Sequence, residues 1–328
     1  MIIARSPMRI SLGGGGTDLP SYYENHGGFF ISAAINQYVY VLINESWHDE
    51  YVLKYSQFER AKSIAEIKHP IIRSALEWFE MAPHLEIASI ADIPQGTGLG
   101  SSGSFTTALL RALHAYRKSD WLSPVELAEQ ACNIEIELLR EPVGKQDPYI
   151  SALGGITCFE VGFDGKVVAF PARISADTLS QMEDNLAIFY TGITRAASDL
   201  LKDQNNRTNA SENEMLDNLH HVKALGRQSK EALESGDMRQ FAELMNEHWR
   251  HKRQRSKGMS NSHIDELYEL AMRSGASGGK LVGAGGGGFL MFYTEEKNRL
   301  REAMQSVKAN EMRFHFDFTG TTLIGDRT

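Results

Sequence analysis

Pro94-Gln95-Gly96-Thr97-Gly98-Leu99-Gly100-Ser101-Ser102-Gly103-Ser104 is the stretch around which the rest of the chain can be arranged. It runs directly into residues 105–116, where apolar side chains recur at helical spacing. Glycines let the backbone approach a ligand closely, and the free N–H groups at a helix N-terminus attract an anion. Serine hydroxyls at this point can cap the helix, contact a phosphate or bind Mg²⁺. The stretch therefore predicts a phosphate-binding loop, with an ordinary capped turn as the alternative.

The loop differs from two common nucleotide-binding patterns. No Lys follows its last glycine, as a Walker A loop requires, and its glycine spacing does not match the dinucleotide-binding fingerprint. The charge of a bound phosphate would therefore have to be balanced by the helix end, by a metal ion and by cations from elsewhere in the chain.

The composition is that of a globular protein with an acidic balance. Of the 328 residues 42% are hydrophobic and 23% are charged, and the formal net charge is −8. This charge argues against a nucleic-acid binder, and Cys132 and Cys158 are too few for a disulfide framework. No apolar run approaches the roughly 18 residues that span a bilayer, and no charged-then-apolar leader opens the chain. We therefore expect a cytoplasmic protein with no membrane partner.

Hydrophobic periodicity and turn residues divide the chain into two lobes, residues 1–170 and 171–328. Strands are predicted at residues 1–10, 29–44, 51–55, 85–93, 156–161, 167–170, 187–191 and 289–293. Helices are predicted at residues 69–81, from 123 onward and at 264–273. Residues 196–258 are expected to be mostly helical, with a loop at 205–209.

Two further glycine-rich loops stand next to strands. Gly13-Gly14-Gly15-Gly16-Thr17-Asp18 follows the first predicted strand, and residues 274–288 (SGASGGKLVGAGGGG) precede the last one. A single site that brings backbone close to phosphates explains all three loops better than three unrelated turns do. We therefore expect the three loops to meet.

A phosphoryl-transfer site also needs a metal ion to bridge the phosphates. In the predicted helix after Ser123, Glu135 shares the apolar face with Ala128, whereas Glu137 lies on the polar face. A carboxylate in an apolar stripe needs a compensating partner. Glu135 and the hydroxyl of Ser101 or Ser102 are therefore the candidate Mg²⁺ ligands, and a rim position open to water is the alternative for Glu135.

Transfer further needs a residue that orients or deprotonates the acceptor hydroxyl. Asp147, in a turn that follows Gly144, is the candidate base, with Arg9 or Lys145 available to keep it ionised. The alternative is a structural Asp-Pro turn. Residues 246–257 (NEHWRHKRQRSK) form one concentrated basic run, which is either a solvated helix face or the binding site for an anionic end of a substrate.

These motifs resemble those of the GHMP kinases, the superfamily of galactokinase, homoserine kinase, mevalonate kinase and phosphomevalonate kinase. Residues 94–102 resemble the signature loop, residues 9–18 the first motif and residues 280–288 the third, in the family's order. The resemblance covers nearly the whole chain. It implies an α+β, two-lobe fold with a ribosomal protein S5 domain 2-like N-terminal lobe (1–170) and a ferredoxin-like C-terminal lobe (171–328).

The resemblance also implies ATP and Mg²⁺ as cofactors, and it assigns roles to matching residues. Asp147 corresponds to the catalytic aspartate, Arg9 to the basic residue that assists it, and Asp18 to the acidic residue that holds sugar hydroxyls. The metal would be held by Ser101 and Glu135. The ATP phosphates would be wrapped by Gly96, Gly98, Leu99, Gly100, Ser101, Ser102 and Gly103.

Two features of the first loop bear on the substrate. Galactokinases carry a Glu-His pair where this chain has Gly15-Gly16, so galactose is not expected. Residues 13–20 instead resemble the sugar-kinase branch that contains heptose 7-phosphate kinases and the kinase part of L-fucokinase. The implied reaction is phosphorylation of the anomeric (C1) hydroxyl of a phosphorylated sugar, for example D-glycero-D-manno-heptose 7-phosphate to the 1,7-bisphosphate. Substrate contacts are expected from Asp18, Gly15, Gly16, Lys145, Arg195, Lys252, Gly286 and Gly287.

Two alternatives remain open. One is an anomeric kinase for an unphosphorylated sugar such as L-fucose, and the other is a sugar-sensing protein that has the fold without the activity. The expected partners are a small-molecule sugar phosphate and ATP, and the expected assembly is a monomer or a homodimer.

Overall fold

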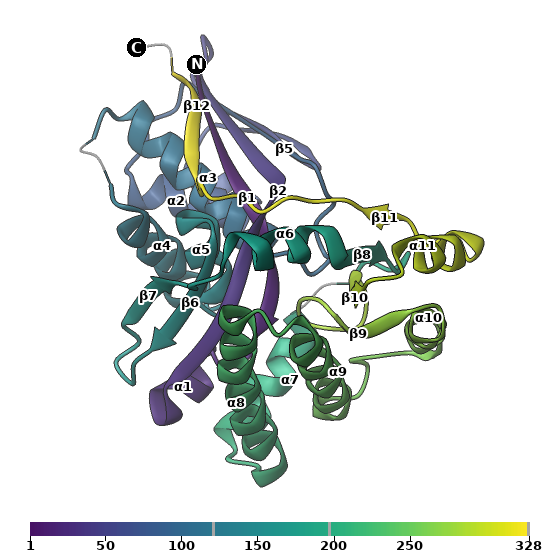
Figure 1. Ribbon diagram of the computed structural model, residues 1–328. Coiled ribbons are helices and arrows are strands. Elements are labelled where there is room, and N and C mark those ends of the chain that lie inside the picture. Colours follow the sequence, from purple (N-terminus) through teal and green to yellow (C-terminus); the bar gives the residue numbers. More distant parts are fainter. Residues whose placement is uncertain (120–121, 196–197, 327–328) are drawn as a thin grey trace.

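The two longest strands, β1 (Ile2–Gly13) and β2 (Gly28–Glu45), pair along most of their length and form the centre of the first lobe (Figure 1). At its other edge β2 pairs first with β6 (Ile156–Val161) and then with β5 (Leu85–Ala91). The computed structural model describes residues 1–119, 122–195 and 198–326. Over these residues the sheet has eight strands, in the order β12-β1-β2-β5-β3-β4, with β6 and β7 continuing from β2. The other strands of this sheet are β3 (Tyr51–Lys54), β4 (Phe58–Ala61), β7 (Val167–Pro171) and β12 (Thr322–Asp326).

Residues 28–35 of β2 are all buried, although consecutive residues of a strand point to opposite faces. Such unbroken burial requires cover on both faces of the sheet. The helices α3 (Ser101–Tyr116), α5 (Gln146–Leu153) and α8 (Asn213–Ser235) all pack against β1 and β2. The other helices of this lobe are α1 (Pro20–His26), the 3₁₀ turn η1 (Ile64–Glu66), α2 (Pro70–Trp78) and α4 (Pro124–Cys132).

The helix starts predicted at the signature loop and at Ser123 are confirmed. α3 begins at Ser101, directly after Gly100 in the left-handed conformation (φ 77°). α4 begins with a capping box, in which the Ser123 hydroxyl accepts from the Glu126 N–H and the Glu126 carboxylate accepts from the Ser123 N–H. The prediction that this α-helix continues through residue 139 is wrong, because α4 ends at Cys132 and residues 133–138 form a π-helix, η2 (Asn133–Leu138).

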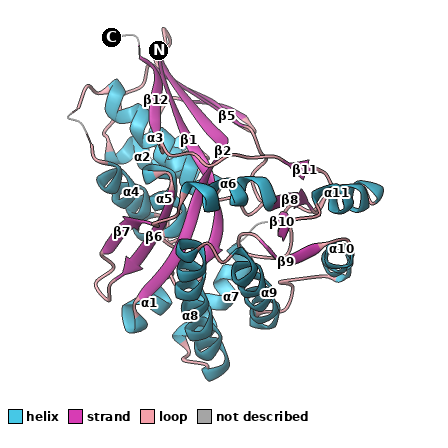
Figure 2. Ribbon diagram, in the orientation of Figure 1, coloured by secondary structure: helices cyan, strands magenta, loops and turns pink. Residues whose placement is uncertain are grey.

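The second lobe holds a four-stranded antiparallel sheet, ordered β11-β8-β10-β9 (Figure 2). Counted along the chain this is the order fourth, first, third, second, which is the ferredoxin-like arrangement expected for this lobe. Its strands are β8 (Leu186–Tyr190), β9 (Ala276–Leu281), β10 (Phe289–Thr294) and β11 (Glu311–Met312). Its helices are α6 (Ala176–Asn185), α7 (Ser198–Asn209), α8, α9 (Met238–Arg255), α10 (Ser262–Arg273) and α11 (Lys297–Ser306).

The end of the chain returns to the first lobe. β12 pairs with β1, with Leu323 opposite Ala4, so a segment of the predicted second domain completes the first sheet. The strands up to residue 171 therefore belong to the first sheet and those after it to the second, with β12 as the exception. One hydrophobic core also joins the lobes, since it contains Phe30 as well as Ile188 and Phe241.

Several local predictions fail for identifiable reasons. The loop expected at residues 205–209 is helical, because α7 continues to Asn209 and the chain breaks only before α8 begins at Asn213. Residues 276–281, expected in a loop because of their glycines, form β9 by pairing with β10. Residues 196–197, where the long helical segment was predicted to begin, lie outside the described residues. Among the described helices, none combines the length and the apolar character needed to cross a membrane.

Candidate active site

A cavity of about 1340 Å³ is lined by residues of both lobes and by all three glycine-rich loops. The expectation that these loops meet therefore agrees with the structure. The loop residues on its wall are Gly15, Gly16, Asp18, Pro94, Gln95, Gly96, Gly98, Gly100, Ser101, Ser102, Lys280, Leu281, Val282, Gly283, Ala284, Gly285 and Gly287.

The signature loop (residues 94–104) and the third glycine-rich loop (residues 274–288) touch through their backbones. A Cβ atom on Gly98 would lie 2.8 Å from the carbonyl oxygen of Val282, and one on Gly283 would lie 2.4 Å from the Cα atom of Gly98. Both glycines also have positive φ, 80° and 77°. Only glycine satisfies both conditions, so these positions allow the backbones of the two lobes to meet at the cavity wall.

Asp147 and Arg9 form an ion pair at the cavity wall. Asp147 lies in the first turn of α5, and Arg9 Nε donates to its Oδ1 atom over 2.7 Å. Arg9 Nη1 also donates to the carbonyl oxygen of Gly98 over 2.5 Å, so the arginine ties the pair to the signature loop. The side chain of Asp147 is still 31% exposed, whereas that of Arg9 is 7% exposed. The carboxylate is thus fixed on one side and accessible on the other.

Asp18 connects the first loop to the start of α5. Its Oδ1 atom accepts from the N–H of Gly16, and its Oδ2 atom accepts from the N–H of Gln146, each over 3.0 Å. A Cβ atom on Gly144 would lie 2.0 Å from Asp18 Oδ2, so a glycine is required in that turn. Burial raises the pKa of Asp18, and Asp147 raises it further by charge repulsion.

Glu135 is buried next to the signature loop, at 3% exposure. Its Oε2 atom accepts from the hydroxyl of Ser102 over 2.8 Å, while its buried Oε1 atom has no hydrogen-bond partner among the described residues. Burial raises the pKa of Glu135 to about 7. A desolvated carboxylate with an unpartnered oxygen, beside a hydroxyl at a helix N-terminus, is a donor set that fits Mg²⁺. The hydroxyl in contact is that of Ser102 and not that of Ser101, the predicted ligand.

Besides the exposed Arg195, four buried basic side chains reach the same cavity from the second lobe. His248, Lys252 and Arg255 occupy one face of α9 at positions i, i+4 and i+7, and Lys280 comes from β9. All four are buried, and none of them is among the ion pairs formed by the described residues.

Lys280 and Arg255 are held by neutral groups. Lys280 donates to the carbonyl oxygen of Leu12 over 2.8 Å, and Arg255 Nη1 donates to Gln204 over 3.1 Å. The Nη2 atom of Arg255 is buried and has no hydrogen-bond partner in the part of the chain that the structure describes. Burial lowers the pKa of Lys280 to about 7 and that of Arg255 to about 10. An anion in the cavity would relieve this unfavourable burial of positive charge.

Most of the predicted site residues lie at the cavity, with a few exceptions. Leu99, Gly103 and Glu135 are buried in or beside the signature loop and do not line the wall themselves. Gly286 packs against Arg195, which does line it. The residues on the wall are Arg9, Gly15, Gly16, Asp18, Gly96, Gly98, Gly100, Ser101, Ser102, Asp147, Arg195, Lys252 and Gly287.

Lys145, predicted to contact the substrate or to assist Asp147, is not among the residues that line the cavity. Its ammonium pairs with Glu129 of α4 over 3.2 Å, in a separate pocket of about 500 Å³. The residue stands just before α5, where its backbone N–H bonds to the carbonyl oxygen of Asp18 and its side chain extends toward α4.

The sequence analysis placed His248 and Arg255 in the basic run offered as a binding site for an anionic end of a substrate, but it named only Lys252 of that run as a site residue. Both share the helical spacing of Lys252, so the periodicity of the run was a usable signal. Lys280 opens the stretch that resembles the third motif, but its place at the cavity depends on the pairing of β9 with β10.

We expect Glu135→Gln to stabilise the ligand-free protein more at pH 8 than at pH 5. The pKa of Glu135 is about 7 in the folded state against an ordinary value of 4.5, so the folded state binds the proton more tightly between these values. The penalty for ionising this buried carboxylate therefore grows as pH rises from 4.5 to 7 and is constant above, on the order of 3 kcal/mol. Urea unfolding at the two pH values measures the difference.

Glu137→Gln is the matched control, since Glu137 lies two residues away and is exposed. This substitution should not reproduce the stabilisation that Glu135→Gln gives at pH 8. Equal effects of the two substitutions would contradict the burial argument.

Comparisons with known proteins agree with this geometry. The GHMP kinases N terminal domain matches residues 62–155 and the GHMP kinases C terminal domain matches residues 229–310, together more than half of the chain. D-glycero-alpha-D-manno-heptose 7-phosphate kinase of Campylobacter jejuni is 27% identical over 97% of both proteins. A bifunctional fucokinase/GDP-fucose pyrophosphorylase of Arabidopsis thaliana is 26% identical over 92% of this chain, which spans 30% of that protein.

Solved structures show the same fold. A D-glycero-D-manno-heptose 1-phosphate kinase from Bacteroides thetaiotaomicron superimposes with a TM-score of 0.82 and 23% identity over the full length of both chains. The two-lobe fold, the meeting of the three loops at one cavity and the two matching family domains thus support the same assignment. The chain belongs to the GHMP kinase family and is a phosphotransferase with an alcohol group as acceptor.

Proposed function

We propose that this protein transfers the terminal phosphoryl group of ATP to the anomeric (C1) hydroxyl of a sugar that already carries a phosphate. A heptose 7-phosphate, converted to the 1,7-bisphosphate, is the leading candidate. The relative from Campylobacter jejuni, which matches nearly end to end, supports this choice. The observation that carries the proposal is the set of buried cations at the cavity, Lys252, Arg255 and Lys280, without carboxylate partners among the described residues.

The signature loop and the start of α3 would bind the ATP phosphates. Three glycines of this loop, Gly96, Gly98 and Gly100, have positive φ, and the N-terminus of α3 follows at Ser101. Free backbone N–H groups at a helix start favour a polyanion. Apolar residues from β5, the segment after it and the start of α2 line the same cavity and suit a flat nucleobase; they include Ile71, Ile90 and Ile93.

Glu135 and Ser102 would hold Mg²⁺, because they present a carboxylate oxygen without a partner next to a hydroxyl. When bound, the ion would neutralise charge on the phosphates. Deprotonation of Glu135 would accompany its binding, since the pKa of this group is about 7 before a cation is present.

Asp147 would accept a hydrogen bond from the acceptor hydroxyl, orienting it and taking its proton as transfer proceeds. The ion pair with Arg9 fixes the carboxylate, and the contact of Arg9 with Gly98 sets its distance from the phosphate loop. Asp18, held rigid by two backbone N–H groups, would bind further hydroxyls of the sugar.

The cations of the second lobe would bind the phosphate that the sugar already carries. Arg255 Nη1 lies near the first loop, within 2.7 Å of where a Cβ atom on Gly16 would be, and its Nη2 atom is available to an anion. Since Asp18 lies just beyond Gly16, a sugar held by Asp18 could reach Arg255 with its distal phosphate. Charge-assisted hydrogen bonds of this kind are stronger than neutral ones.

An anomeric kinase for an unphosphorylated sugar such as L-fucose is the second candidate function. It is favoured by the fucokinase relatives, which match 90% or more of this chain. A catalytically silent sugar sensor is a weaker alternative, because Arg9, Asp18 and Asp147 are all present at the cavity.

Incubation with ATP, Mg²⁺ and a panel of sugars and sugar phosphates, read by phosphorus NMR, tests the function directly. We expect a new anomeric phosphate signal with heptose 7-phosphate and a much weaker one with heptose or L-fucose. Preferred turnover of the free sugars would favour the second candidate, and no product with any sugar would favour the sensor.

We expect Arg255→Ala to lower kcat/KM for the phosphorylated sugar by roughly 10²-fold, since a hydrogen bond to a charged group contributes about 1.5–3 kcal/mol. The KM for ATP should change little. Arg253→Ala is the matched control. Arg253 is on the same helix but does not line the cavity, and its Nη1 atom donates a 3.0 Å hydrogen bond to Asp265. An equal loss with phosphorylated and free sugars would exclude a role for Arg255 in binding the distal phosphate.

Asp147→Asn should lower kcat by about 10²-fold or more, with little change in ATP affinity, because the substitution removes the proton acceptor and keeps the shape. Steady-state kinetics and nucleotide titration measure the two effects. Asp164→Asn, in the exposed turn between β6 and β7, should retain wild-type rates. Wild-type turnover by Asp147→Asn would remove Asp147 from the mechanism.

A further inference from the structure

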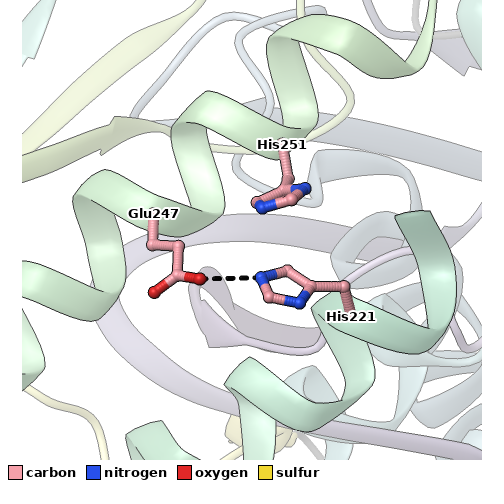
Figure 3. A group of neighbouring side chains, drawn as sticks. All are labelled: His221, Glu247 and His251. Carbon is pink, nitrogen blue, oxygen red and sulfur yellow. Dashed lines mark hydrogen bonds and ion pairs between the residues drawn. The ribbon is translucent and has the colours of Figure 1, made fainter. Parts of the chain in front are cut away.

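A second group of side chains with metal-ligand chemistry lies outside the cavity, where α8 packs against α9. Figure 3 shows His221 of α8 pointing toward Glu247 and His251 of α9. The carboxylate of Glu247 and the ring of His251 come from adjacent turns of one helix, four residues apart. This spacing places two potential ligands on one face, with the third opposite them on the neighbouring helix.

The three groups are already close together. Glu247 Oε1 lies 2.8 Å from Nε2 of His221, and the two imidazole rings have their centroids 3.9 Å apart with planes inclined by 38°. One ligand atom from each residue lies within 4.8 Å of the others. Metal–ligand bonds of about 2.0–2.1 Å in a tetrahedron place ligand atoms roughly 3.3 Å apart, so side-chain adjustments alone would complete the geometry.

A histidine–glutamate ion pair accounts for only two of these three residues. It does not account for the second imidazole, since a protonated His221 would repel a protonated His251 at this separation. The centroids of the two rings lie 3.9 Å apart, so the second imidazole is placed beside the pair, where it can offer a ring nitrogen to a shared ion.

We propose that His221, Glu247 and His251 bind one divalent transition-metal ion of the zinc class, with water completing the coordination. Two imidazoles and one carboxylate form a donor set suited to Zn²⁺, whereas Mg²⁺ prefers oxygen ligands alone. The side chains of His221 and Glu247 are 38% and 37% exposed, so the ion has a path from solvent and room for a water ligand.

Such an ion would fasten together the two helices that support the acceptor end of the cavity. On α8, Gly226 packs against the first glycine loop, where its Cβ position would lie 2.9 Å from the Cα atom of Gly14. On α9, Lys252 and Arg255 follow directly after His251 in sequence and line the cavity. Binding of the ion would therefore stabilise the folded protein and hold the basic face of α9 in place.

Calorimetric titration of the nucleotide-free full chain with Zn²⁺, in excess Mg²⁺ to occupy the oxygen-ligand site, tests the proposal. We expect one equivalent to bind, the melting temperature to rise with Zn²⁺, and Co²⁺ to produce visible absorption bands typical of imidazole coordination. His251→Ala and Glu247→Gln should each weaken Zn²⁺ binding by about tenfold or more and abolish the rise in melting temperature.

His315→Ala is the matched control, because His315 forms a comparable exposed pair with Glu183, over 3.2 Å, without being part of the three-residue group. It should bind Zn²⁺ as the wild type does. Melting curves in EDTA establish that each variant is folded, and Glu247→Gln keeps the test valid if a histidine substitution prevents folding. Failure of the wild type to bind Zn²⁺, or unchanged binding by both His251→Ala and Glu247→Gln, would overturn the proposal.

Discussion

The site depends on one constraint, the direct backbone contact between the signature loop (residues 94–104) and the third glycine-rich loop (residues 274–288). Gly98 and Gly283 come from different lobes and leave no space between them for a Cβ atom. A few residues further on, a Cβ atom on Gly288 would lie 2.1 Å from the carbonyl oxygen of Thr97. Because side chains are absent here, the lobes close around one cavity and the backbone itself forms its wall. The charged residues around the wall acquire their positions from this closure.

Arg9 links the signature loop to Asp147, the residue that faces the acceptor. Its guanidinium bonds both to the carbonyl oxygen of Gly98 and to the carboxylate of Asp147, so the loop and the acceptor-facing residue are fixed relative to each other. The protein also buries two further carboxylates, Asp18 and Glu135, and burial raises the pKa of each. Buried charge of both signs around one cavity is unfavourable in the free protein, and it is expected where charged ligands complete the site.

Helix α9 serves two surfaces of the second lobe. One face carries His248, Lys252 and Arg255 to the cavity, and the neighbouring face carries Glu247 and His251 to α8. The two faces alternate along the same turns, so a movement of the helix would displace both groups together. Helix α9 packs directly against β9, where a Cβ atom on Gly278 would lie 1.9 Å from the carbonyl oxygen of Ala242. This close contact fixes the position of the helix on the sheet.

The sequence by itself determined the features that follow local rules. The glycine loops, the start of α3, the capping box of α4 and the choice of Glu135 over Glu137 all rest on the geometry of neighbouring residues. Only the tertiary structure decided that Lys145 turns to Glu129, that Ser102 rather than Ser101 meets Glu135, and that β12 returns to pair with β1. It also decided that Lys280 reaches the cavity. These outcomes depend on contacts between residues far apart in the chain, for which hydrophobic periodicity and turn residues carry no signal.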